Sequence, residues 1–245
     1  MEMNRAIRED PGIGIFLLSG FEVRADGRRL HLPATASRLV AYLALQNRPV
    51  SRPVAAGVLW PESSQERAQA SLRSALWRTR KLDERIIDPT HEALCLERGV
   101  RVDVISILAA VSEMDASRRP PNPLVLPLTQ CALELLPDWY DDWVSFERES
   151  FRLRILHALE KMADLHRTEG SVGLAVDCAF AAVRLEPLRE SAHRQLIAAH
   201  IAAGNASEAV NQFRYFRQLL MTELGVEPSE LMHEQIESLG LGVGR

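Results

Sequence analysis

The sequence predicts a mainly α-helical fold with a small β component, divided into two domains. Residues 13–103 carry short strands, then three helical stretches, then a second group of strands. Residues 159–222 repeat a helical pattern with a period of 34 residues. The charge follows a similar division, because residues 1–102 carry a net +4 and residues 103–245 a net −8. A basic half joined to an acidic half indicates a polyanion-binding domain attached to a domain with another task.

The composition is that of an ordinary globular protein. Its 245 residues suffice for two domains, and 47% of them are hydrophobic. Cys95, Cys131 and Cys178 lie far apart without metal-binding spacing, as expected of small buried side chains in a reducing compartment. Residues 1–12 are polar, and no apolar stretch in the chain is long enough to span a membrane. We therefore expect a cytoplasmic protein with a disordered N-terminus and no membrane partner.

The N-terminal half begins with a predicted hairpin and continues with helices. Residues 13–32 combine an apolar run with alternating apolar and polar side chains, which predicts strands. Asp26-Gly27 predicts a type I′ turn between two of them, because both central residues of that turn take positive φ. The three helical stretches that follow span residues 35–47, 51–60 and 66–82.

A second hairpin is predicted to close this domain. Residues 93–96 and 100–104 are short apolar stretches separated by Glu97-Arg98-Gly99. Three helices with a closing hairpin make a winged helix-turn-helix, which we place at residues 13–103. In that arrangement the third helix enters the major groove of DNA and the hairpin touches the backbone.

The third helix, residues 66–82, has two opposed faces. At about 100° per residue, one face is apolar, and it consists of Ala68, Leu72, Ala75, Leu76, Thr79 and Leu82. Trp77 points away from that face. Its neighbours on the outer face are Arg73, Ser74, Arg80 and Lys81, with Arg78 on the flank. Water does not favour an exposed indole. We therefore expect either a neighbouring hairpin or a bound nucleic acid to cover Trp77.

The C-terminal half, residues 104–245, is predicted to be all α-helical. A short apolar helix over residues 104–116 precedes a proline-rich loop over residues 117–127 and a helix over residues 128–136. A long helix then runs to about Thr168.

Trp139 and Trp143 lie one helical turn apart in an acidic cluster at the start of that long helix. They could be core anchors or part of a ligand site, and their spacing favours core anchors.

The 34-residue repeat predicts helical hairpins of the tetratricopeptide type. Gly170 and Gly204 occupy the same place in the two copies, and so do His166 and His200. Small residues at helix crossings with glycine at the turn are typical of such repeats. Stacked repeats leave a concave surface that suits a protein partner. Because the two histidines are equivalent positions, we expect them to pack rather than to bind metal or to catalyse.

Several segments resemble a known family. LWPESSQERAQASLRSALWRTRKL resembles the end of a winged-helix DNA-binding domain of the response-regulator type. The segments PDWYDDWVSFERE, RLEPLRESAHRQLIAAHIAAGNASEAV and LLMTELGVEPSEL resemble the bacterial transcriptional activator domain. The combination is similar to the Streptomyces antibiotic regulatory protein family of transcriptional activators.

The resemblance implies sequence-specific binding to promoter direct repeats, pairing of two copies on double-stranded DNA, and recruitment of RNA polymerase holoenzyme. It also implies control of a biosynthetic gene cluster, and association with the nucleoid when bound. The expected DNA-binding residues are Arg73, Ser74, Trp77, Arg78, Arg80 and Lys81 on the third helix, with Arg98 and Arg101 in the wing. The sequence departs from the family pattern at Thr79, where an apolar residue is usual, and before the last wing strand, which lacks a Gly-Tyr pair.

Two other functions remain open from the sequence. The chain could be a repeat-based adaptor whose winged helix does not bind DNA, and salt-dependent DNA binding would separate that function from activation. An enzyme is disfavoured, because the sequence has no phosphate-binding GxxxxGK[ST] loop, no metal spacing and no glycine-flanked nucleophile. We accordingly expect no cofactor and no metal.

Overall fold

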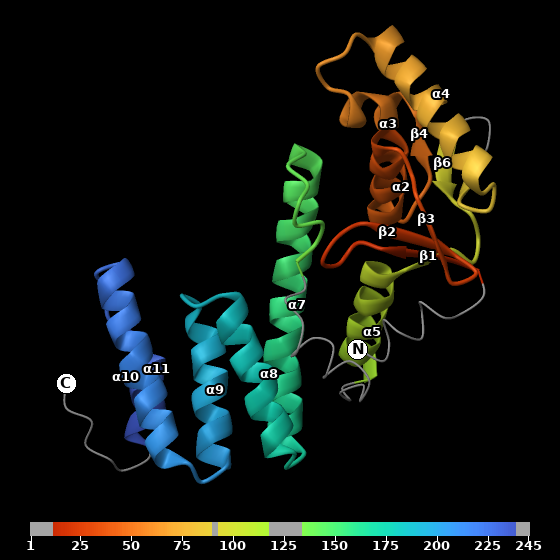
Figure 1. Ribbon diagram of the computed structural model, residues 1–245. Helices are drawn as coiled ribbons and strands as arrows, with labels where there is room; N and C mark the ends of the chain where they lie inside the picture. Colours follow the sequence, from red (N-terminus) through yellow and green to blue (C-terminus); the bar gives the residue numbers. More distant parts are fainter. Residues whose placement is uncertain (1–11, 90–92, 118–133, 239–245) are drawn as a thin grey trace. The chain divides into compact units, whose positions relative to one another are not determined.

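The computed structural model describes residues 12–89, 93–117 and 134–238 (Figure 1). It confirms the predicted fold class, a winged helix-turn-helix followed by all-α tetratricopeptide-like repeats. The predictions for the disordered N-terminus up to residue 11, for the loop after residue 117 and for most of the helix over residues 128–136 lie outside the described residues.

The chain packs as two compact units. The N-terminal unit spans residues 1–109 and 132–151, and the C-terminal unit spans residues 110–131 and 152–245. The described residues 134–151, which follow the boundary that the sequence suggests after residue 103, pack with the N-terminal unit.

The strands and helices are as follows. The N-terminal unit contains β1 (Ile13–Phe16), β2 (Glu22–Ala25), β3 (Arg28–Leu30), α2 (Ala34–Gln46), β4 (Val50–Ser51), α3 (Arg52–Leu59), α4 (Gln65–Leu82), β5 (Ile87–Pro89), β6 (Ala93–Leu96) and β7 (Arg101–Val102). Helices α5 (Asp103–Ser117) and α7 (Asp142–Thr168) contribute residues to both units. The C-terminal unit continues with α8 (Val172–Leu185), α9 (Glu190–Ala202), α10 (Ala206–Glu223) and α11 (Glu230–Glu237).

Two small sheets frame the winged helix. The first has the strand order β3-β2-β1-β7, and the second has the order β4-β6-β5. The predicted turn between β2 and β3 is confirmed, because Asp26 and Gly27 both have positive φ, 49° and 77°. β1 pairs antiparallel with β2 and parallel with β7, so it lies in the middle of the first sheet.

The prediction that residues 93–96 and 100–104 form a hairpin is wrong. β6 instead pairs antiparallel with β5, and its other edge pairs with β4. β7 joins the first sheet, where Val102 lies opposite Ile15 and both side chains are buried. Gly99, at φ 91°, lies between the two strands. β7 thus extends the first sheet beside β1, and the hairpin that closes the winged helix is β5–β6.

Helices α2, α3 and α4 pack against one another, as Figure 1 shows. One face of α2 is buried throughout, and it consists of Ala36, Leu39, Val40, Leu43 and Ala44. Asn47 ends α2 in the left-handed conformation, at φ 46°. This three-helix core fixes the orientation of α4.

Asp103 links the end of β1 to the start of α5. Its carboxylate is 3% exposed and accepts hydrogen bonds from the backbone N–H groups of Leu17 and Leu18, at 3.0 and 3.1 Å. It also accepts one from the N–H of Val104 at 2.7 Å. A carboxylate at a helix N-terminus satisfies free donors there and suits the helix dipole. Segments 86 positions apart are thereby joined.

The start of α7 and the residues just before it belong to the N-terminal unit, and two tryptophans there make aromatic contacts. Trp139 lies 5.5 Å from the Phe21 ring, and Trp143 lies 5.4 Å from the Tyr42 ring, between centroids. The two tryptophans meet edge to face at 6.2 Å. They pack on the core of the winged helix, as core anchors would, and both are half-buried. The predicted start of the long helix is wrong, because α7 begins at Asp142 and Trp139 precedes it.

Arg148 of α7 holds the segment before the helix in place. Its guanidinium donates hydrogen bonds to the backbone oxygens of Leu135 at 2.8 Å, Leu136 at 2.5 Å and Trp139 at 3.0 Å. Leu135 and Leu136 are themselves buried, and Leu135 forms a β-bridge with Leu18. Residues 134–139 are thus fastened to both β1 and α7.

The C-terminal unit repeats one helical hairpin, as the 34-residue period predicts. Gly170 and Gly204 both have positive φ, 80° and 74°, in the turns α7–α8 and α9–α10. The amide that follows each glycine donates to the carbonyl oxygen of His166 or His200, at 2.8 and 2.9 Å. Both glycines therefore end a helix in the same left-handed turn.

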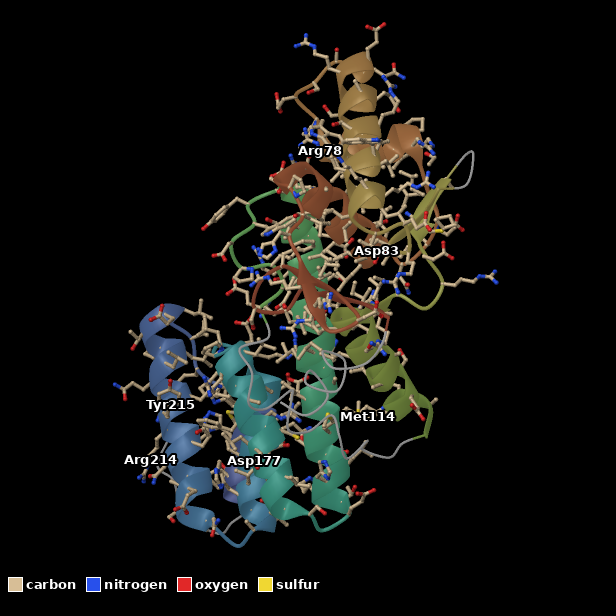
Figure 2. All side chains as sticks on the ribbon, turned by 45° about the vertical axis from the view of Figure 1, so that its right-hand side comes forward. Arg78, Asp83, Met114, Asp177, Arg214 and Tyr215 are labelled. Atoms are coloured by element: carbon tan, nitrogen blue, oxygen red, sulfur yellow. The ribbon has the colours of Figure 1, made fainter. Side chains whose placement is uncertain are left out.

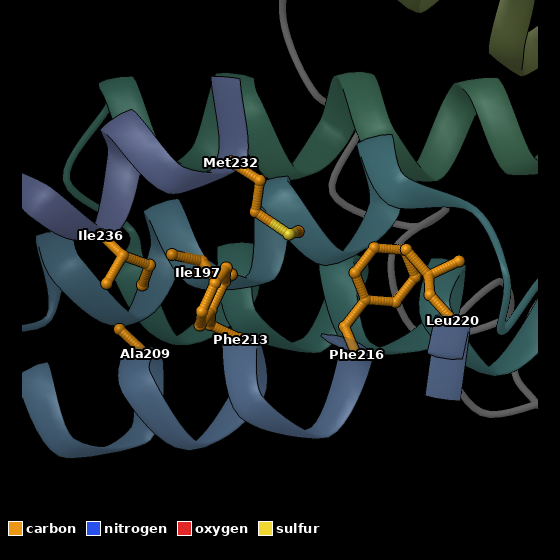
Figure 3. Close-up of a cluster of buried hydrophobic side chains, with 7 residues drawn as sticks. All are labelled: Ile197, Ala209, Phe213, Phe216, Leu220, Met232 and Ile236. Atoms are coloured by element: carbon orange, nitrogen blue, oxygen red, sulfur yellow. The ribbon is translucent and has the colours of Figure 1, made fainter. Parts of the chain in front are cut away.

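The last repeat is closed by α11, as Figure 3 shows. Side chains from α9, α10 and α11 form one buried cluster, which consists of Ile197, Ala209, Phe213, Phe216, Leu220, Met232 and Ile236. Ser229 occupies the N-cap position of α11, but its hydroxyl donates to the Glu190 carboxylate instead of capping the helix.

Two histidines of this unit, His166 and His193, are buried, and His200 is half-buried. His193, which is fully buried, stacks on Phe216 with 4.1 Å between ring centroids. Its Nε2–H donates to the Pro187 carbonyl oxygen at 2.8 Å, and its Nδ1 accepts from the Gln212 amide at 2.6 Å. Burial lowers the pKa of this imidazole, so the neutral form fits the site.

Burial also lowers the pKa values of His166 and His200. That these two equivalent histidines serve only in packing stays a prediction. Among the described residues, no cluster of three or more His, Cys, Asp or Glu side chains is suited to a metal ion.

Within the described part of the chain, no helix is both long and apolar enough to cross a bilayer.

Candidate nucleic-acid interface

Helix α4 buries one face and exposes the other. The inner face contacts α2 and α3, and its buried residues are Ala68, Leu72, Ala75, Leu76 and Thr79. All six helix residues that the sequence predicts to bind DNA are exposed, namely Arg73, Ser74, Trp77, Arg78, Arg80 and Lys81. The opposed faces inferred from the sequence are therefore present.

Two details of the inner face are informative. Leu82, which the helical period places inside, is 43% exposed, because it is the last residue of α4 and the chain turns away at Asp83. Thr79 is fully buried, and its hydroxyl donates to the Ala75 carbonyl at 3.0 Å. That bond satisfies the one polar group placed where an apolar residue is usual.

The outer face of α4 forms one side of a shallow basic hollow of about 520 Å³. Its lining residues are Arg52, Arg73, Leu76, Trp77, Arg80, Lys81 and Glu84. Four of these seven residues are cationic and one is anionic. Arg78 lies on the flank of the same helix, as Figure 2 shows.

The cations on this surface are unneutralised. Within the described residues, none of Arg52, Arg73, Arg78, Arg80 and Lys81 forms an ion pair with a carboxylate. Exposed cations without ion-pair partners on one helix face produce a positive potential, which attracts the phosphates of nucleic acids.

Trp77 lies at the centre of that face with 62% of its surface exposed. No described segment covers it, so the expectation that a neighbouring hairpin packs over the ring does not hold among these residues. The Lys81 ammonium lies 5.0 Å from the indole centroid, a cation–π contact that orders both side chains.

An ion-pair network lies just beyond α4, where Figure 2 places Asp83. The Arg85 guanidinium contacts the Asp83 carboxylate at 2.7 Å and the Asp26 carboxylate at 3.0 Å. Arg85 lowers the pKa of both carboxyl groups. The network ties the end of α4 to the β2–β3 turn and engages Arg85 internally, so this arginine is not one of the free cations.

Arg98 and Arg101 are not in the wing, contrary to the sequence prediction. Arg98 is exposed in the turn after β6, and Arg101 lies on β7 in the first sheet. The prediction fails because the wing is β5–β6, which ends at Leu96. The structure brings neither residue into the hollow beside α4.

Sequence reasoning missed Arg52, the first residue of α3, which lines the hollow opposite the cations of α4. A helix-turn-helix places the start of its second helix beside the recognition helix. The basic residue next to the cap position Ser51 was the available signal.

Comparisons with known proteins agree with this architecture. Residues 131–239 match the family described as the bacterial transcriptional activator domain. The match covers most of the C-terminal part of the chain.

A solved structure, that of Mycobacterium tuberculosis EmbR in complex with a low-affinity phosphopeptide, has a similar fold. The TM-score is 0.71 at 22% sequence identity, and the match covers 94% of this chain and 65% of that chain. The chain thus spans about two thirds of the EmbR structure's length. No curated protein matches the chain.

Proposed function

We propose that this chain is a non-enzymatic, sequence-specific DNA-binding activator of transcription. Helix α4 enters the major groove, with Arg73 and Trp77 facing the bases and Arg78 facing a phosphate. Two copies bind side by side on promoter direct repeats, and the C-terminal unit recruits RNA polymerase. The genes controlled are those of a biosynthetic cluster, and the protein acts in the cytoplasm on the nucleoid.

The single observation that supports DNA binding most strongly is the outer face of α4. It presents exposed cations that form no ion pair among the described residues, on a helix that packs against α2 and α3. A recognition helix needs that combination, because base contacts must be positioned and phosphate contacts must remain available.

The activating role is supported by the match of residues 131–239 and by charge. Residues 103–245 carry a net −8, so phosphates repel this half of the chain. A stacked repeat array offers surface for a protein partner instead.

The test compares two arginines of α4 with one outside it. Sites are selected from random duplexes with the whole protein, and binding is measured over a range of salt concentrations. Arg73→Ala should cost about 1–3 kcal/mol and relax the preference at one position. Arg78→Ala should weaken all sequences alike and reduce the salt slope by about 1.

Arg214→Ala provides the matched control, because Arg214 is an exposed arginine on α10 (Figure 2). It should leave affinity, preference and salt slope unchanged. If Arg73→Ala changed neither affinity nor preference, α4 would not be the recognition helix. Absence of salt-dependent binding by the intact protein would favour an adaptor function instead.

A further inference from the structure

Trp77 differs chemically from its neighbours in the basic hollow. Among the residues that line it, Arg52, Arg73, Arg80 and Lys81 are cations that suit phosphates and base acceptors. Leu76 is only 6% exposed, so Trp77 supplies the apolar surface that a partner would meet. An exposed indole amid cations needs an apolar contact when the surface is covered.

The major groove offers one apolar group. Each base pair presents hydrogen-bond donors and acceptors there, and only thymine adds a methyl group. We propose that Trp77 contacts a thymine 5-methyl group, so that this residue selects a T·A pair at one position of the site. The inference rests on the proposed function.

The geometry of α4 suits such a contact. Side chains on a helix lean toward its N-terminus, so the indole lies over the preceding turn. Ser74, three residues earlier on the same face, is small and exposed, which leaves room beside the ring for a base edge. Lys81 contacts the indole from the following turn at 5.0 Å, so the ring is oriented before DNA arrives.

The experiment removes one methyl group at a time. In the duplex selected with the whole protein, each thymine is replaced in turn by deoxyuracil, which keeps every hydrogen-bonding group and loses only the methyl. At one position the wild-type protein should bind about fourfold more weakly, the effect of one buried methyl group. Trp77→Ala should bind the thymine and uracil duplexes equally, and Trp77→Phe should retain part of the difference.

Two controls keep the result specific. Arg78→Ala should weaken binding while keeping the thymine–uracil ratio, because it acts on a phosphate. Trp77→Ala is expected to keep the helical circular dichroism and unfolding midpoint of the wild type, since the ring is largely exposed.

The outcomes are distinguishable. Specific binding without any uracil-sensitive position would overturn the inference alone, and it would indicate that the indole donates through Nε1 or contacts a sugar. A uracil effect that persists in Trp77→Ala would also overturn it. Absence of any selected sequence would overturn the proposed function, and this inference with it.

Discussion

Replacing Arg148 by alanine should destabilise the winged-helix unit, although the residue lies far from α4 in the sequence. The change removes three hydrogen bonds to the backbone oxygens of Leu135, Leu136 and Trp139. A hydrogen bond from a charged group contributes about 1.5–3 kcal/mol, and an acceptor left buried and unpaired costs a similar amount. Because water can reach part of this half-buried site, we expect a total loss of about 2–4 kcal/mol rather than the full sum.

The assay uses the position of the four tryptophans, Trp60, Trp77, Trp139 and Trp143, all of which lie in the N-terminal unit. Tryptophan fluorescence during urea denaturation of the intact protein therefore follows that unit alone. With a slope of about 2 kcal/mol per molar urea, the midpoint should fall by about 1–2 M.

A matched control lies on the same helix. Arg154 is exposed on α7 and makes no hydrogen bond or ion pair with the described residues, so Arg154→Ala should stay within about 0.5 kcal/mol of the wild type. The urea midpoint of Arg148→Lys should lie between those of the wild type and Arg148→Ala, because a lysine keeps the charge but lacks the several N–H donors of the planar guanidinium. Equal midpoints for Arg148→Ala and Arg154→Ala would refute the assignment of residues 134–139 to the winged-helix core.

Three other outcomes are expected. A fragment ending at residue 117 should unfold more readily than the N-terminal unit of the intact protein, because it lacks residues 132–151; equal fluorescence midpoints in urea would contradict this. The C-terminal unit should lose stability as the pH falls below about 6.5. The reason is that His166, His193 and His200 have lowered pKa values in the folded state, so the unfolded chain takes up protons first. Helical circular dichroism during urea denaturation at several pH values would measure the effect, and a midpoint that does not change with pH would refute it. On DNA, the direct repeats should lie about 10–11 bp apart, and inserting about 5 bp should abolish cooperative binding while about 10 bp restores it only in part; a footprint on an inverted repeat would exclude head-to-tail pairing.

Helix α4 could be predicted because its signal is local. The spacing of apolar residues along residues 66–82 fixes which side chains face inward, and α2 and α3 supply the surface against which they pack. The same is true of the repeat, where Gly170 and Gly204 mark equivalent turns. In both cases the residues that carry the pattern pack against residues only a few tens of positions away in the sequence.

The pairing of the wing strands could not be predicted, because its signal is not local. Strands of two to four residues have too little pattern to specify a partner, so adjacency in the sequence suggested that β6 pairs with β7. The burial of Val102 beside β1, which decides the pairing, depends on residues far away in the sequence. Arg52 was missed because a single cation at a helix start carries no periodic signal.

The link from Asp103 to the end of β1 has a consequence for the order of folding. β1 is synthesised first, but its parallel neighbour β7, the Asp103 carboxylate and Leu135 are made much later. The pairing around β1 therefore cannot be completed until Leu135 has been made. Such non-local pairing slows folding, and domains otherwise tend to fold as they emerge during synthesis. The winged-helix unit should thus become complete only after residues 134–148 have been made, because Leu135 and Arg148 complete its packing.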